Sequence, residues 1–138
     1  RRKLTKPPLK LAATAGRESI YLFGHRIYED NRSNGGGIVD GKGGNDIIWG
    51  SDGADTIYGR AGNDTIRGWD GSDTIWPDEG SDFVDAGSGN DFIYGWGDSS
   101  VDQFHGGLGT DRIDGNNNDS CVLNPGDSSM PCAYGLVG

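Results

Sequence analysis

Residues 41–94 read GKGGNDIIW, GSDGADTIY, GRAGNDTIR, GWDGSDTIW, PDEGSDFVD and AGSGNDFIY, which are six consecutive units of nine residues. An eleven-residue unit, GWGDSSVDQFH (95–105), and a further nine-residue unit, GGLGTDRID (106–114), continue the pattern. Degraded units flank the array at 32–40, with Val39 at the eighth position, and at 115–123, with Ser120 at the sixth position and Val122 at the eighth. A short, fixed period predicts a stack of repeated units, and the repeat therefore decides the fold class.

Each unit joins a turn-forming half to a strand-forming half. Six residues rich in Gly, Asn and Asp predict a turn, and three residues such as Thr-Ile-Tyr predict a short strand. Two units return the chain to its start, so one coil takes 18 residues and successive coils stack about 4.8 Å apart. The middle strand residue is apolar in every unit and should point inward: Ile48, Ile57, Ile66, Ile75, Val84, Ile93, Phe104 and Ile113.

The sixth position of all eight units is Asp, and residues 18 apart should stack in two columns. The first column is Asp46, Asp64, Asp82 and Asp102, and the second column is Asp55, Asp73, Asp91 and Asp111. Two bare carboxylates about 5 Å apart repel by about 3 kcal/mol at an effective dielectric near 20. A divalent cation between them would turn repulsion into attraction. Oxygen-rich turns without His or Cys favour Ca²⁺, and we expect about six sites between coils, with weaker half-sites at the column ends.

The composition excludes several classes of protein. Gly accounts for 26 of 138 residues and hydrophobic residues for 33%, which is unlike a helical bundle. No apolar run approaches the roughly 20 residues of a membrane-spanning helix. The net charge of −9 is uneven, because residues 1–33 carry eight basic and three acidic residues, whereas residues 34–138 carry four basic and 18 acidic ones. The acidic body should attract cations and repel nucleic acid.

The units resemble the RTX nonapeptide, G-G-x-G-x-D-x-U-x, of haemolysin-type calcium-binding proteins. This resemblance implies an all-β fold, a right-handed parallel β-roll, with Ca²⁺ held by sixth-position Asp side chains and turn carbonyls of successive coils. It implies that the eight column Asp residues are ligands, and the fourth-position glycines match the family: Gly44, Gly53, Gly62, Gly71, Gly80, Gly89 and Gly109. The chain departs from the pattern at the second position, which is Gly only at Gly87 and Gly107, and at Pro77, which replaces a first-position Gly.

Four segments are expected along the chain. Residues 1–18 should form a basic extended arm, and residues 19–40 an N-terminal cap, with a strand or hairpin over 19–28 and a degraded first repeat. A cap is favoured for residues 19–28 over an assembly element that pairs with the sheet edge of another subunit. Residues 41–114 should form the calcium-binding roll, and residues 115–138 a C-terminal cap.

Two cysteines, Cys121 and Cys132, lie close together near the C-terminus. A disulfide between them is favoured over two buried thiols, because no further Cys or His stands at a zinc-binding spacing. It would close a 12-residue loop, stabilise the cap by about 3 kcal/mol and indicate an oxidising compartment.

No catalytic residues are predicted, since the chain has neither H-E-x-x-H nor G-x-S-x-G. We expect a secreted, non-catalytic module that folds on Ca²⁺ and serves a structural, adhesive or self-assembling role. The alternatives are a carbohydrate-binding module, or the non-catalytic RTX part of a larger secreted enzyme.

The outer face of one sheet should carry a row of aromatic residues: Tyr58, Trp76, Phe92 and Tyr94. Contiguous apolar patches are uncommon on soluble monomers, so this row is a candidate docking face. A second copy of the chain or another extracellular protein is favoured as the partner, with a polysaccharide as the alternative. Stacking that merely stabilises the sheet would explain the same row.

Overall fold

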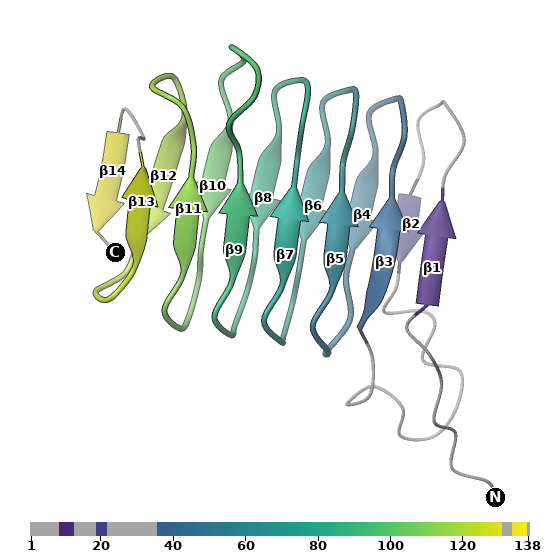
Figure 1. Ribbon diagram of the computed structural model, residues 1–138, viewed down its shortest axis with the longest axis horizontal. Coiled ribbons are helices and arrows are strands. Elements are labelled where there is room, and N and C mark those ends of the chain that lie inside the picture. The colour runs from purple at the N-terminus through teal and green to yellow at the C-terminus, as the bar shows by residue number, and fades with distance from the viewer. Residues whose placement is uncertain (1–8, 13–18, 22–35, 131–133, 138) are drawn as a thin grey trace, which may run out of the picture.

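The computed structural model describes the backbone of residues 9–12, 19–21, 36–130 and 134–137, and side-chain burial over residues 36–128. Its strands form two parallel sheets that face each other along the length of the molecule (Figure 1). Sheet 1 contains β1 (Leu9–Ala12), β3 (Gly37–Asp40), β5 (Thr56–Tyr58), β7 (Thr74–Trp76), β9 (Phe92–Tyr94), β11 (Arg112–Asp114) and β13 (Ser128–Met130). Sheet 2 contains β2 (Ser19–Tyr21), β4 (Ile47–Trp49), β6 (Thr65–Arg67), β8 (Phe83–Asp85), β10 (Gln103–His105), β12 (Ser120–Leu123) and β14 (Tyr134–Val137).

The chain alternates between the two sheets, so that each strand pairs with the strand two places later. Thr56 pairs with Thr74, and Ile47 pairs with Thr65, 18 residues away in both cases. This is the predicted coil, and the parallel β-solenoid is confirmed. Across the eleven-residue unit the spacing is 20 residues, from Phe83 to Gln103. The two extra residues lie in the turn between β9 and β10, which stands higher than its neighbours in Figure 1.

The core is a single layer of inward side chains between the sheets. All eight predicted inward residues are fully buried, as is Val39 in the degraded unit before the array. One prediction about this layer is wrong. Cys121, not Val122, is the buried residue of β12, because Phe104 pairs with Cys121. The turn of residues 115–119 is one residue shorter than a regular turn, and this moves the register forward by one.

The two ends of the solenoid contain strands that the repeat does not cover. β1 lies inside the segment predicted as an arm and pairs with β3, while β2 pairs with β4 at the edge of sheet 2. β2 thus lies where a covering strand is predicted, and residues 22–28 are outside the described part of the chain. At the other end, β13 pairs with β11 and β14 with β12. Cys132 lies outside the described residues, so the disulfide and the cap that it closes remain predictions.

Helices are absent from the described part of the chain, and no helix there is long and apolar enough to cross a membrane.

Candidate metal centre

Two rows of turns connect the sheets. The first row follows the strands of sheet 1 and contains residues 41–46, 59–64, 77–82, 95–102 and 115–119. The second row follows the strands of sheet 2 and contains residues 50–55, 68–73, 86–91, 106–111 and 124–127. In most six-residue turns the second and fourth residues have positive φ. The second is often not glycine: Lys42, Arg60, Trp69 and Asp78 have φ between 69° and 77°.

The sixth-position aspartates form the two predicted columns, one along each row of turns. Every one of the eight is at least 97% buried. From Asp55 to Asp111, the carboxylate of each column aspartate accepts a backbone N–H of the preceding coil. For example, Asp64 N donates to Asp82 Oδ1 at 2.7 Å, and Asp73 N donates to Asp91 Oδ1 at 2.8 Å. The columns are therefore continuous ladders in which one carboxylate oxygen, Oδ1, is used to join coil to coil.

In most turns, the second oxygen of the column carboxylate has no hydrogen-bond donor. Oδ2 is buried and has no hydrogen-bond partner in Asp64, Asp73, Asp82, Asp91, Asp102 and Asp111. A buried acceptor without a donor costs about 1–3 kcal/mol, and more when it is charged. Such an arrangement is stable only if a proton or a cation neutralises these carboxylates.

Burial also shifts the ionisation of the columns. Desolvation raises the pKa of Asp73 and Asp82 to about 9, and that of Asp64, Asp91 and Asp102 to about 7. Backbone N–H bonds lower these pKa values, but by less than desolvation raises them. At neutral pH the interior of each column therefore strongly disfavours negative charge that no cation balances.

Near Asp64 and Asp46, Oδ2 and a backbone carbonyl of the next coil face the same small space. A Cβ added to Gly59 would lie 2.6 Å from Asp64 Oδ2 and 2.7 Å from the carbonyl oxygen of Pro77. At Gly41 the same two kinds of oxygen lie at 3.0 Å (Asp46 Oδ2) and 2.8 Å (Gly59 O). The missing side chain thus leaves a small space that two oxygens of successive coils face. This donor set is that of a hard cation such as Ca²⁺.

Carbonyl oxygens are essential to any such site. Within the described part of the chain, no three Asp, Glu, His or Cys side chains converge in a way that could hold a metal. A cation would therefore be held by a carboxylate together with backbone oxygens. The carbonyls of the first-position residues, such as Gly59 and Pro77, were not singled out by the sequence.

The fourth-position glycines allow the coils to approach closely. Gly71 has φ of 98°, and an added Cβ would lie 2.5 Å from the carbonyl carbon and oxygen of Gly53 in the preceding coil. No side chain fits there, so these residues contribute backbone and close contact. Gly53 is the exception among the seven predicted positions, because its φ is not positive.

Two further aspartates extend the columns beyond the predicted eight. Asp102 N donates to Asp119 Oδ1 at 3.1 Å, and Asp111 N donates to Asp127 Oδ1 at 2.9 Å. The nine-residue period did not predict Asp119 or Asp127, because their turns are shorter than six residues. The signal was the spacing of Asp119 to Cys121, which equals that of every sixth-position Asp to its inward residue.

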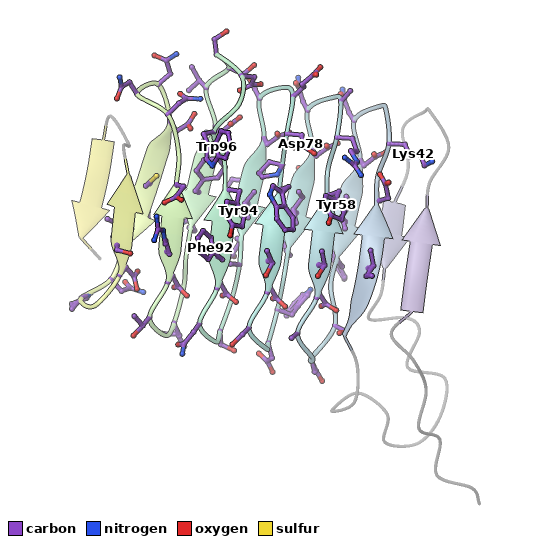
Figure 2. All side chains as sticks on the ribbon, in the orientation of Figure 1. Lys42, Tyr58, Asp78, Phe92, Tyr94 and Trp96 are labelled. Atoms are coloured by element: carbon purple, nitrogen blue, oxygen red, sulfur yellow. The ribbon has the colours of Figure 1, made fainter. Side chains whose placement is uncertain are left out.

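The predicted docking residues come together on the outer face of sheet 1, in the middle of Figure 2. Trp76 stacks between Tyr58 and Tyr94, with ring centroids 4.9 and 4.8 Å away, and Phe92 stacks on Tyr94 at 4.1 Å. Guanidinium groups cover the two ends, Arg60 over Tyr58 at 4.5 Å and Arg112 over Phe92 at 5.2 Å. We call these four rings the aromatic stack. Its flat faces are used within the stack, and docking there stays a prediction.

A shallow hollow of about 370 Å³ lies along the first row of turns. Trp96 is 62% exposed at this hollow, and Asp78, Glu79 and Arg60 complete its polar lining. Figure 2 shows Trp96 and Asp78 on neighbouring turns. Arg60 is fixed there by a two-pronged ion pair with Asp40 at 3.0 and 3.2 Å.

Comparison with known proteins agrees with this geometry. The model of the RTX calcium-binding nonapeptide repeat, described as four copies, matches residues 33–66, 40–75, 49–84, 76–99 and 96–127. Together these matches run from residue 33 to residue 127, over more than half of the chain. The searches of curated proteins and of solved structures found no match. The chain therefore belongs to the RTX calcium-binding nonapeptide repeat family, and its fold is a Ca²⁺-binding β-roll.

Proposed function

We propose that this chain is a non-catalytic structural module that acts outside the cell and folds when Ca²⁺ enters its turns. The observation that carries the proposal is the set of buried, unpaired Oδ2 atoms along the two columns. The residues that would hold the ions are the column aspartates, together with backbone carbonyls of the next coil. Ca²⁺ would supply the positive charge that these oxygens lack and would link one coil to the next.

The rest of the molecule provides little stabilising free energy to replace that of the bound metal. Each unit contributes one main inward apolar side chain, worth about 1.5–3 kcal/mol. The rest of each unit is turn and outward-facing strand, which bury little apolar surface to offset the entropy lost on ordering the backbone. The calcium-free chain should therefore be largely unfolded, and binding energy should become folding energy.

The proposed extracellular location would agree with a weak calcium affinity. Extracellular calcium modules bind with dissociation constants of about 10⁻⁴–10⁻³ M, and we expect this range here. Such sites fill outside cells and stay empty at cytosolic calcium levels. A predicted disulfide between Cys121 and Cys132 would fit the same oxidising environment.

The test is to record far-UV circular dichroism and small-angle scattering in chelator and in millimolar Ca²⁺. We expect an expanded chain with little β signal in chelator and a compact β-rich particle in Ca²⁺. Mg²⁺ at the same concentration is the control and should not fold the chain, because it demands near-octahedral geometry. Equal β content in chelator and in Ca²⁺ would contradict the proposal.

Polysaccharide binding is a second candidate, and the hollow beside Trp96 favours it. An exposed indole face suits the apolar face of a sugar ring, and the carboxylates and guanidinium around it suit hydroxyl groups. The aromatic stack is less suited, since its ring faces are already covered.

Affinity electrophoresis through gels that contain a soluble polysaccharide tests this role in the presence of Ca²⁺. Glycan binding predicts that wild type is retarded and that Trp96→Ala is not. Trp69→Ala is the matched control, because Trp69 is 43% exposed and belongs to the other row of turns. Absence of retardation for wild type across the gels would remove this candidate.

A further inference from the structure

Three aspartates of the columns differ from the others in how their second oxygen is paired. Asp55, Asp119 and Asp127 each accept a backbone N–H of their own turn on Oδ2. The donors are Ser51 N at 2.6 Å, Asn116 N at 2.7 Å and Asn124 N at 2.7 Å. Since Oδ1 of each also accepts an N–H of the preceding coil, both oxygens of these carboxylates are satisfied by the protein.

The turn of residues 50–55 shows how this pairing arises in a turn of regular length. Ser51 and Gly53 hold the second and fourth positions, and neither has positive φ, unlike their counterparts in the neighbouring turns. The changed backbone aims Ser51 N at the carboxylate. Ser51 Oγ also lies 3.0 and 3.1 Å from the two oxygens of Asp55, and accepts N–H bonds from Gly36 and Gly53.

The two other turns achieve the same pairing by being short. Residues 115–119 and 124–127 have five and four residues instead of six. Asn116 and Asn124 therefore stand three residues before their aspartates, where their N–H groups reach Oδ2. All three aspartates lie at ends: Asp55 is the first member of the second column, and Asp119 and Asp127 are the last members of the two columns.

We infer that backbone N–H groups take the place of Ca²⁺ at these three column ends, so that Asp55, Asp119 and Asp127 do not bind the ion. A polarised N–H and a cation compete for the same carboxylate lone pairs, and the N–H repels a cation placed beside it. Calcium is then confined to turns that are not closed in this way. The prediction that Asp55 is a ligand and the prediction of weak half-sites at the column ends are replaced at these positions.

This inference rests on the proposed calcium-dependent folding and adds that Ser51 determines whether the turn of Asp55 binds Ca²⁺. The six-residue turns of Asp64, Asp73, Asp82, Asp91 and Asp111 have positive φ at their second and fourth residues and keep an open Oδ2. The turn of Asp55 has the same length and also ends in Asp, but Ser51 N and Oγ occupy the Oδ2 atom of that residue. One side chain and its backbone thus lower the number of ions that the roll holds.

The experiment counts bound Ca²⁺ by native mass spectrometry at saturating calcium, with circular dichroism as a check on folding. Asp55→Asn should retain the wild-type number of ions, whereas Asp73→Asn, one coil along the same column, should lose at least one. Ser51→Gly should gain one ion, because glycine lets the second position adopt positive φ and removes the hydroxyl. Lys42→Gly is the control at the second position of another turn and should leave the count unchanged.

The outcomes separate this inference from the proposed function. A wild type that binds calcium, with Asp55→Asn losing as many ions as Asp73→Asn, overturns the inference alone. An unchanged count in folded Ser51→Gly does so too. A wild type that binds no calcium overturns the inference together with the proposed function.

Discussion

Close contact between coils requires glycine at the fourth turn position as much as the positive φ angle does. Gly71, at the fourth position of its turn, and Gly97, the third residue of the longer turn 95–102, both have positive φ, at 98° and 134°, but their surroundings differ. A Cβ on Gly71 would lie 2.5 Å from the Gly53 carbonyl, whereas a Cβ on Gly97 would have nothing within 4 Å. Substitutions at these two glycines therefore separate the free-energy cost of a positive φ from the cost of overpacking between coils.

Gly71→Ala should destabilise the calcium-loaded roll by about 3 kcal/mol, because it adds overpacking to backbone strain. Gly97→Ala should cost about 1 kcal/mol, from the strain alone. Urea unfolding in saturating Ca²⁺ measures both. Equal losses in the two variants would show that close approach between the coils is not what requires glycine.

The column carboxylates predict a pH dependence in the absence of calcium. Their folded-state pKa values lie above the ordinary 3.8, at about 9 for Asp73 and Asp82 and about 7 for Asp64. The folded chain then binds protons that the unfolded chain releases, and stability is lost as pH rises through these values. Calcium-free protein should show more β signal at pH 5 than at pH 9, and Asp73→Asn should weaken this difference.

Circular dichroism across this pH range in metal-free buffer makes the measurement. In saturating Ca²⁺ the trend should reverse at low pH, because protons then compete with the metal for the same oxygens. A calcium-free signal that is constant from pH 5 to pH 9 would show that the carboxylates do not control folding.

At the scale of the strands, the aromatic stack joins β5, β7 and β9 across the face of sheet 1. Each stacked pair contributes about 0.5–1.5 kcal/mol, and Trp76 takes part in two pairs. Trp76→Ala should therefore destabilise the roll by about 1–3 kcal/mol. Trp96→Ala is the control, since Trp96 is 62% exposed on a turn, and it should cost less than about 0.5 kcal/mol.

Static light scattering of the same variants tests the docking prediction. If sheet 1 mediates self-association, wild type should form oligomers in Ca²⁺ and Trp76→Ala should not. A wild type that stays monomeric would leave the stack with a stabilising role alone, which the covered ring faces already favour.

At the scale of the whole molecule, the period of nine predicted the two sheets, the inward layer and the two columns. These follow from local rules, because alternation fixes which strand residue points inward and Asp marks where each turn ends. The nine-residue period predicted the wrong register for residues beyond the array, such as Val122. A shortened turn shifts the register without changing the composition. The closed turn at Ser51 was not foreseen either, because its backbone angles depend on contacts with the preceding coil.

The solenoid also predicts how far a local change should spread. Each coil contacts its neighbours alone, so loss of the predicted Cys121–Cys132 disulfide should loosen β12 and the strands beside it and leave the central coils intact. Hydrogen exchange before and after reduction in Ca²⁺ measures this, with Cys132→Ser as the matching variant. Two free thiols in native protein would reject the disulfide, and increased exchange throughout the roll would contradict the local response.

The stack of Tyr58, Trp76 and Tyr94 gives the protein an optical signature of its own. Parallel rings less than 5 Å apart couple electronically, and excitation absorbed by either tyrosine can pass to the indole between them. Each of the three rings comes from a different coil. Emission from Trp76 on tyrosine excitation, and the near-ultraviolet dichroism of the coupled rings, would thus report when three successive coils have come into register, without any attached label.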